Sequence, residues 1–194
     1  MKRLFLVLVL VGITGVSLFA WEPQDLTKFP IGQDGKSWIL NFGIGVPYDY
    51  GYSAYKDYIS IPPMRLSLDK NVEMGDKKLP FFIGGIFGYS GWGYTGRVFD
   101  YDRYEYHDKK YFYNRISIGG RFGYHFNWDV KNLDTYAVTT AGWIIYTGDY
   151  ADAGFPLWGV NVGARYFVNN WFGFWLETGY TSFSWLDIGL AFKF

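Results

Sequence analysis

Hydrophobic and polar residues alternate along most of the chain after residue 36, and this period of two predicts β-strands. In the stretch "YFYNRISIGGRFGYHF", apolar side chains such as Phe112 and Ile118 share one face, while Arg115, Arg121 and several glycines share the other. No helical period competes with this pattern. The alternation predicts eight strands, at residues 37–46, 63–69, 79–89, 111–126, 135–147, 156–167, 171–180 and 184–194. Both faces of the segment 135–147 are mixed, so the sequence leaves its inward face open.

The connections between the predicted strands differ in length and composition. Residues 48–60 and 91–110 are long and rich in Tyr, Asp and Gly, whereas residues 127–132 and 168–170 are short. Strands joined in this way predict an all-β fold, an antiparallel up-and-down barrel of eight strands. Long loops at one end and short turns at the other are typical of barrels that cross an outer membrane.

The N-terminus has the pattern of a cleavable signal peptide. Lys2 and Arg3 precede an apolar run from Leu4 to Leu18, and the small residue Ala20 precedes a change to polar sequence. The run is shorter than the roughly 20 residues that a membrane-spanning helix needs, so we expect cleavage after Ala20 rather than an anchor. The chain therefore divides into a signal peptide (1–20), an N-terminal periplasmic segment (21–36) and an outer-membrane β-barrel domain (37–194).

The sizes of the side chains on the two faces of each strand distinguish a membrane barrel from a soluble, lipocalin-like one. Aromatic residues make up 23% of the chain, which also contains 25 glycines, and the large apolar side chains and most strand glycines fall on opposite faces. An eight-stranded barrel has room inside only for its own side chains or one small ligand, so the bulky face is expected to face lipid. Aromatic residues near the strand ends are the expected interfacial girdles: Trp38, Tyr89, Trp92, Tyr111, Trp128, Tyr166, Trp171, Tyr180 and Trp185.

The last third of the chain resembles small bacterial outer-membrane barrels. Alternate residues of the final strand are apolar and end with Leu190, Phe192 and Phe194. The preceding stretch "GVNVGARYFVNNWFGFWLETGY" is similar to the penultimate hairpin of barrels related to the transmembrane domain of outer-membrane protein A, the opacity proteins and the outer-membrane protein W group. This similarity is carried by Gly163, Arg165, Tyr166, Phe167, Glu177, Gly179 and Tyr180. The resemblance implies a location in the bacterial outer membrane, and a final strand that the barrel-assembly machinery recognises.

Charged residues on the inward faces predict an ion network inside the barrel. Glu177 and Asp187 fall almost opposite each other if the last turn centres near Ser182, and paired carboxylates suit either acid–base catalysis or a structural network. Buried charges need partners, so we expect a structural network that closes the lumen to ions. Its expected members are Arg65, Arg115, Arg121, Arg165, Glu177 and Asp187; Asp69, His125 and Lys193 share the same faces.

The sequence offers little support for catalysis or for a cofactor. Some small barrels modify lipid A with a Ser–His–acid arrangement near the outer rim, but neither of the two histidines, His107 and His125, has a serine two residues on. With no cysteine, nothing has the spacing of metal ligands. The formal charge of +0 becomes slightly negative after loss of Lys2 and Arg3, which argues against a nucleic-acid partner. We expect no catalytic, cofactor or metal site.

The predicted loop 91–110 is the candidate binding surface. Its tyrosines alternate with charged residues, and tyrosine offers a broad contact area at a low cost in entropy. Tyr101, Tyr104 and Tyr106 are the candidate contact residues. A second interpretation is that the tyrosines only extend the strands above the membrane and pack against lipopolysaccharide sugars or each other.

Three functions remain open at this stage. We expect a non-enzymatic, monomeric outer-membrane protein that serves adhesion to an extracellular or host ligand through its loops, or envelope integrity. Its other expected partners are outer-membrane lipid, lipopolysaccharide and the assembly machinery. The alternative is transport of small hydrophobic molecules, as proposed for the protein W group, which requires a lateral opening or an apolar pocket at the outer end. A lipid A-modifying enzyme has the least support.

Overall fold

The structure is a computed structural model that describes residues 37–47, 56–74, 77–128, 130–149 and 154–194. The expected signal peptide (1–20), the N-terminal segment (21–36) and most of the first predicted loop lie outside the described residues. Within these residues, no helix has the length and apolarity needed to cross a membrane.

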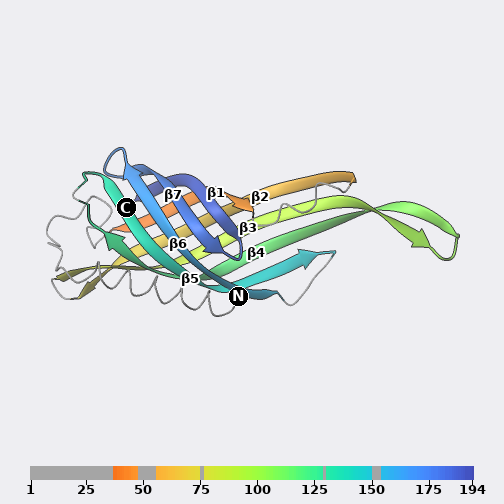
Figure 1. Cartoon of the computed structure of the whole chain (residues 1–194), viewed down its shortest axis with the longest axis horizontal. Coiled ribbons are helices and arrows are strands. Elements are labelled where there is room, and N and C mark those ends of the chain that lie inside the picture. Colours follow the sequence, from red (N-terminus) through yellow and green to blue (C-terminus); the bar gives the residue numbers. More distant parts are fainter. Residues whose placement is uncertain (1–36, 48–55, 75–76, 129, 150–153) are drawn as a thin grey trace, which may run out of the picture.

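The described chain forms a closed barrel of eight antiparallel strands (Figure 1). Each strand pairs with its neighbours in sequence, and β1 pairs with β8 to close the barrel. We call the end at which β1 begins and β8 finishes the terminal end, and the opposite end the hairpin end. The eight-stranded up-and-down barrel predicted from the alternation is confirmed. The strands are β1 (Trp38–Pro47), β2 (Lys56–Met74), β3 (Lys77–Asp100), β4 (Glu105–Phe126), β5 (Leu133–Gly148), β6 (Phe155–Phe167), β7 (Phe172–Thr181) and β8 (Ser184–Lys193).

The apolar faces predicted from the alternation point outward, and the predicted polar faces point into the barrel. In β1, for example, Phe42 and Ile44 are exposed while Ile39 and Asn41 are buried. The structure also settles the phase of β5, which the sequence left open. Its inward side chains are Asp134, Tyr136, Val138, Thr140 and Ile144.

The segment predicted as the second long loop is instead an extension of the sheet. The pairing of β3 with β4 runs without interruption from Phe81–Tyr124 to Asp100–Glu105, and only Tyr101–Tyr104 form the turn. The hairpin therefore projects well beyond the other strands at the hairpin end (Figure 1). Its loop-like composition was misleading because cross-strand side-chain pairs, which depend on register, stabilise the hairpin.

Two of the expected girdle residues lie on the other face of this hairpin. Trp92 and Tyr111 share the inward face with Ser90 and Arg115, since alternate residues of a strand point the same way and the register there is unbroken. Neither is therefore part of an outward girdle.

Two cross-strand glycine pairs bring neighbouring strands unusually close. Gly43 pairs with Gly189 across the β1–β8 seam, and Gly119 pairs with Gly142 between β4 and β5, on the opposite wall of the barrel. A Cβ at Gly189 would lie 2.0 Å from the backbone oxygen of Phe42, and one at Gly142 would lie 2.1 Å from that of Ile118. Glycines at such places allow a sheet to bend sharply, as a narrow barrel requires.

Candidate functional site

Acidic and basic side chains alternate in one continuous series of contacts through the barrel interior. All of its members are buried, and they come from β2, β4, β5, β6, β7 and β8. Several contacts cross the axis and join strands that are not neighbours in the sheet. We call this series the ion chain; in order, it is Asp187, Arg65, Glu177, Arg121, Asp69, Arg165, Asp134 and His125.

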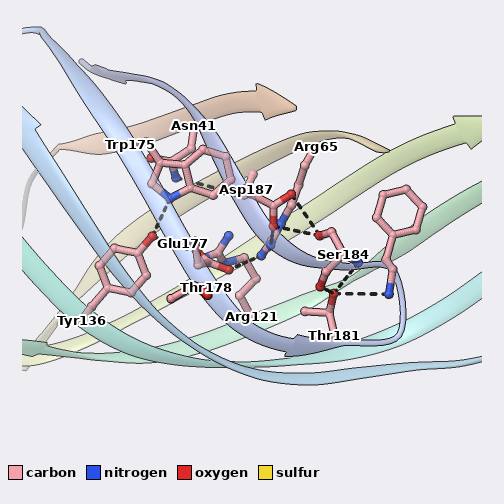
Figure 2. A network of polar contacts seen from close by, with 12 residues as sticks. Asn41, Arg65, Arg121, Tyr136, Trp175, Glu177, Thr178, Thr181, Ser184 and Asp187 are labelled. Carbon is pink, nitrogen blue, oxygen red and sulfur yellow. Dashed lines mark hydrogen bonds and ion pairs between the residues drawn. The ribbon is translucent and has the colours of Figure 1, made fainter. Parts of the chain in front are cut away.

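The half of the ion chain nearer the hairpin end centres on two carboxylates. Glu177 and Asp187 are direct register partners on β7 and β8, as the sequence predicted. Arg65 donates to both of them, through Nη2 to Glu177 and Nη1 to Asp187 (Figure 2). Arg121 Nη2 donates to the second oxygen of Glu177 at 2.7 Å. Both oxygens of Glu177 are therefore held by guanidinium groups, an arrangement suited to a structural network rather than to a free general base.

Two aromatic side chains hold Glu177 in place. The Tyr136 hydroxyl donates to Glu177 Oε2 at 2.9 Å and accepts a hydrogen bond from Trp175 Nε1 at 2.7 Å (Figure 2). Glycine leaves room for the Tyr136 ring, because a Cβ at Gly163 would lie 2.3 Å from the ring carbon Cζ. The glycines of the inner wall thus make room for the side chains that support the ion chain.

The half of the ion chain nearer the terminal end centres on Arg165. Its Nη1 donates to Asp134 Oδ2 at 2.9 Å, its Nε donates to Asn41 Oδ1 at 2.9 Å, and its Nη2 contacts Asp69. His125 Nδ1 lies 2.6 Å from the other oxygen of Asp134. Each of the four carboxylates in the ion chain thus contacts at least one guanidinium, which offsets the cost of burying charge.

The structure brings together five of the six side chains that the sequence assigned to a lumen network. The exception is Arg115, which is nearer the hairpin end: its Nε donates to Ser90 Oγ at 3.1 Å, and its guanidinium lies 5.3 Å from the Trp92 ring and 5.5 Å from the Phe183 ring. Sequence reasoning missed Asp134 because the predicted strand began at residue 135, whereas β5 begins at Leu133. It missed Tyr136 because the phase of β5 was open. The sequence did contain a signal for Asp134. It is a carboxylate, and it is the direct register partner of Arg165, which needs an acidic partner inside the barrel.

An apolar cluster lies inside the barrel toward the hairpin end. Phe183 folds inward from the β7–β8 turn, whose shape is fixed by a hydrogen bond from the Ser184 N–H to the Thr181 hydroxyl at 2.8 Å. The cluster occupies the place where the transport interpretation requires an apolar pocket. Its members are Ile86, Ile144, Leu157 and Phe183, with Tyr146 and Phe155 packed against it.

The tip of the β3–β4 hairpin carries the candidate contact residues. Tyr101, Tyr104 and Tyr106 are 79%, 83% and 70% exposed, and their rings surround Phe99 at centroid distances of 5.0, 6.1 and 5.0 Å. The Asp100 carboxylate fixes the turn by accepting hydrogen bonds from two backbone N–H groups beyond it. The three tyrosines are thus presented on a defined support rather than on a loop.

Comparison with known proteins gives no family assignment. No protein-family model matches the chain, and no curated protein matches it significantly.

Among the described residues, no group of three or more His, Asp or Glu side chains is arranged to hold a metal ion. His107 lies on the projecting hairpin and His125 lies near the terminal end, so the two histidines are at opposite ends of β4.

Proposed function

We propose that the protein is a non-enzymatic integral barrel of a bacterial outer membrane whose projecting hairpin contacts a partner outside the cell. The observation that carries the membrane part is the outward belt of apolar side chains. Every strand contributes to it; Phe42 on β1, Phe122 on β4 and Phe174 on β7, for example, are each about half exposed. Soluble monomers rarely expose apolar patches larger than a few hundred Å². An apolar exterior around a polar interior is typical of outer-membrane barrels.

The height of the belt supports the same proposal. On β6, Trp158 and Tyr166 are both exposed and lie eight residues apart. At about 3.3 Å per residue they are about 26 Å apart along the strand, and a strand tilt of 35–45° reduces this to about 20 Å across the membrane. The apolar band of known barrels is of similar height, about 25 Å, between two aromatic girdles. We place the hairpin end outside, because the longer segments of such barrels face the exterior.

Fractionation of cells that express the full chain tests the membrane location. We expect the protein in the outer-membrane fraction, with a folded form that migrates differently from the boiled form on a denaturing gel. Recovery of the processed chain from a water-soluble periplasmic extract would contradict the proposal.

Two valine substitutions sharpen this test because a lipid environment and water predict different results. Val162 is exposed in the middle of the belt, whereas Val130 is exposed in the β4–β5 turn, outside it. In a membrane, Val162→Arg is expected to lower the free energy of unfolding by about 2–4 kcal/mol. The control Val130→Arg is expected to change it by less than about 0.5 kcal/mol. Equal, small effects in lipid vesicles would indicate that the belt does not face lipid.

The hairpin tip supports the interaction part of the proposal. Its exposed tyrosines are large, rigid and amphipathic, which suits contact with a partner at a low cost in entropy. Between residues 97 and 110 there are four cations and four anions, so the tip has no net charge that would select a highly charged partner. Contact through tyrosine rings, rather than electrostatic attraction, is therefore the expected basis of binding.

Shortening the hairpin tests this interaction. Gly96 and Lys109 are direct register partners, so residues 97–108 can be replaced by an Asn-Gly turn without changing the pairing below them. We expect the shortened barrel to fold, and cells that display it to bind host-cell or matrix surfaces no better than cells without the protein. Unchanged binding would refute the assignment of the hairpin as the contact surface.

A length-matched control separates the tyrosines from the hairpin itself. A variant in which Tyr101, Tyr104 and Tyr106 are all changed to serine keeps the full hairpin. It is expected to lose binding as fully as the shortened barrel, because the rings supply the contact area.

A further inference from the structure

The outer part of the β3–β4 hairpin has a strand edge with which no other described strand pairs. β4 pairs with β5 only as far as Tyr113, and Asp149 bonds to the backbone of the next residue, Phe112. Beyond this point β4 pairs with β3 alone, and the hairpin projects past the other described strands (Figure 1). We call the side of residues 105–110 that faces away from β3 the β4 edge.

Backbone donors and acceptors point along the β4 edge at every second residue. The Phe112 N–H donates to Asp149 Oδ2 at 2.7 Å, and the Phe112 carbonyl accepts from the Asp149 N–H at 2.9 Å, so both groups of Phe112 point away from β3. In an antiparallel strand, alternate residues direct both groups to the same side. The N–H and C=O groups of Lys110, Asp108 and Tyr106 therefore point to the edge, where another strand can pair with them.

The side chains of the β4 edge favour a strand of the same sequence as the partner. Residues 105–110 read "EYHDKK", and all six are exposed. Such charges oppose pairing with an arbitrary apolar strand. An antiparallel pair with a two-fold axis at His107, however, places Glu105 of each copy opposite Lys109 of the other, and Tyr106 opposite Asp108. Opposite charges then face each other twice, and the edge is complementary to itself.

The neighbouring two-fold registers fit less well. An axis at Asp108 places this carboxylate opposite its own copy, which is unfavourable, and brings the hairpin turn of the second copy against Asp149. An axis at Tyr106 places Glu105 opposite His107 and reduces the overlap to residues 104–108. The axis at His107 therefore combines the longest unobstructed overlap with the best match of charge.

We propose that the β4 edge pairs with the β4 edge of a second copy of the protein on a neighbouring cell. The two strands run in opposite directions, so the two barrels lie at opposite ends of a joined sheet of four strands and belong to facing membranes. Phe112 of each copy lies beside residue 102 of the other. About ten residues, or about 33 Å at 3.3 Å per residue, therefore separate the two Phe112 positions.

This inference rests on the proposed membrane location and orientation, and clustering of vesicles tests it. The full barrel is reconstituted into lipid vesicles that carry one of two dyes. Clusters are measured by light scattering, and particles that carry both dyes are counted by flow cytometry. We expect vesicles with the original barrel to cluster, because many weak pairs act together between two vesicles. Vesicles without protein, or with the barrel that lacks residues 97–108, are expected to stay single.

Exchange of charge between two variants identifies the register. Glu105→Lys places a cation opposite Lys109 in both pairs, and Lys109→Glu places an anion opposite Glu105 in both pairs. Each variant alone is expected to cluster vesicles at least about tenfold less than the original barrel. When vesicles of the two variants are mixed, opposite charges face each other again, and clusters that carry both dyes are expected. Asp102→Lys makes the same change of charge in the turn, outside the pairs, and is expected to cluster like the original barrel.

Three outcomes would overturn the proposal: no clustering by the original barrel, undiminished clustering by Glu105→Lys or Lys109→Glu alone, or no clustering by their mixture. Rescue in the mixture also shows that both variants are folded. The role of the hairpin tip fails separately, because Glu105→Lys keeps its three tyrosines and is expected to bind host-cell or matrix surfaces like the original barrel. Lost clustering with retained surface binding would therefore support both proposals. Clustering by an original barrel that binds no such surface would refute the role of the tip and support pairing of the edges.

Discussion

Glu177→Gln is expected to lower the free energy of unfolding of the barrel by about 3–5 kcal/mol, the usual cost of removing one partner from a buried ion pair. Glu177 accepts hydrogen bonds from Arg65, Arg121 and Tyr136 in a fully buried position. Glutamine has nearly the same shape but no charge, and its amide group would face guanidinium donors. Arg65 and Arg121 would each keep one carboxylate, Asp187 and Asp69 respectively. Unfolding by urea in lipid vesicles, followed by tryptophan fluorescence, measures the loss.

A control substitution removes the same charge without disturbing the ion chain. Glu73 is exposed on β2, so Glu73→Gln is expected to change stability by less than about 0.5 kcal/mol. If Glu177→Gln lowers stability no more than Glu73→Gln, the ion chain does not hold the strands together. A double-mutant cycle of Glu177→Gln with Arg121→Met adds a second check. The double variant should lose less free energy of unfolding than the two single variants lose together.

The ion chain shows what a sequence can and cannot predict about such an interior. Alternation assigned most inward residues correctly because bulky apolar residues and glycines rarely exchange faces in a narrow barrel. The pairing of charges was harder, because it depends on contacts across the axis between strands far apart in sequence. Arg115 illustrates the limit: it lies on the predicted inward face, yet its position along the strand places it beside Trp92 and Phe183, above the ion chain.

The β3–β4 hairpin shows a different limit. Tyr, Asp and Gly between residues 91 and 110 are common in loops, so composition alone predicted one. In the structure the same residues form cross-strand pairs, such as Tyr94–Tyr111 and the ion pair of Arg97 with Asp108 at 3.8 Å. The open interpretation that the tyrosines extend the strands and pack against each other describes this part of the hairpin. Composition could not distinguish a loop from a hairpin because the stabilising contacts exist only in one register.

Gly189→Ala is expected to prevent stable closure of the barrel between β1 and β8. The added Cβ would lie 2.0 Å from the Phe42 backbone oxygen and 2.5 Å from the Gly43 Cα, whereas ordinary contacts need more than 3 Å. Both neighbours are backbone atoms of β1, so relief requires the strands to move apart. Overpacking of a core usually costs about 1–3 kcal/mol, and a backbone clash is expected to exceed this range. We therefore expect the folded, heat-modifiable form to be lost from gels.

The matched control for Gly189→Ala is a glycine that faces open space. A Cβ at Gly85, on the outward face of β3, would have no neighbouring atom closer than the Gly119 oxygen at 3.9 Å. Gly85→Ala is therefore expected to fold like the original chain, with a change in stability below about 0.5 kcal/mol. The two variants add the same methyl group to the same barrel. A difference in stability between them can therefore be attributed to the close contact between β1 and β8. A folded, heat-modifiable Gly189→Ala barrel as stable as Gly85→Ala would show that the close approach of β1 and β8 is not needed for closure.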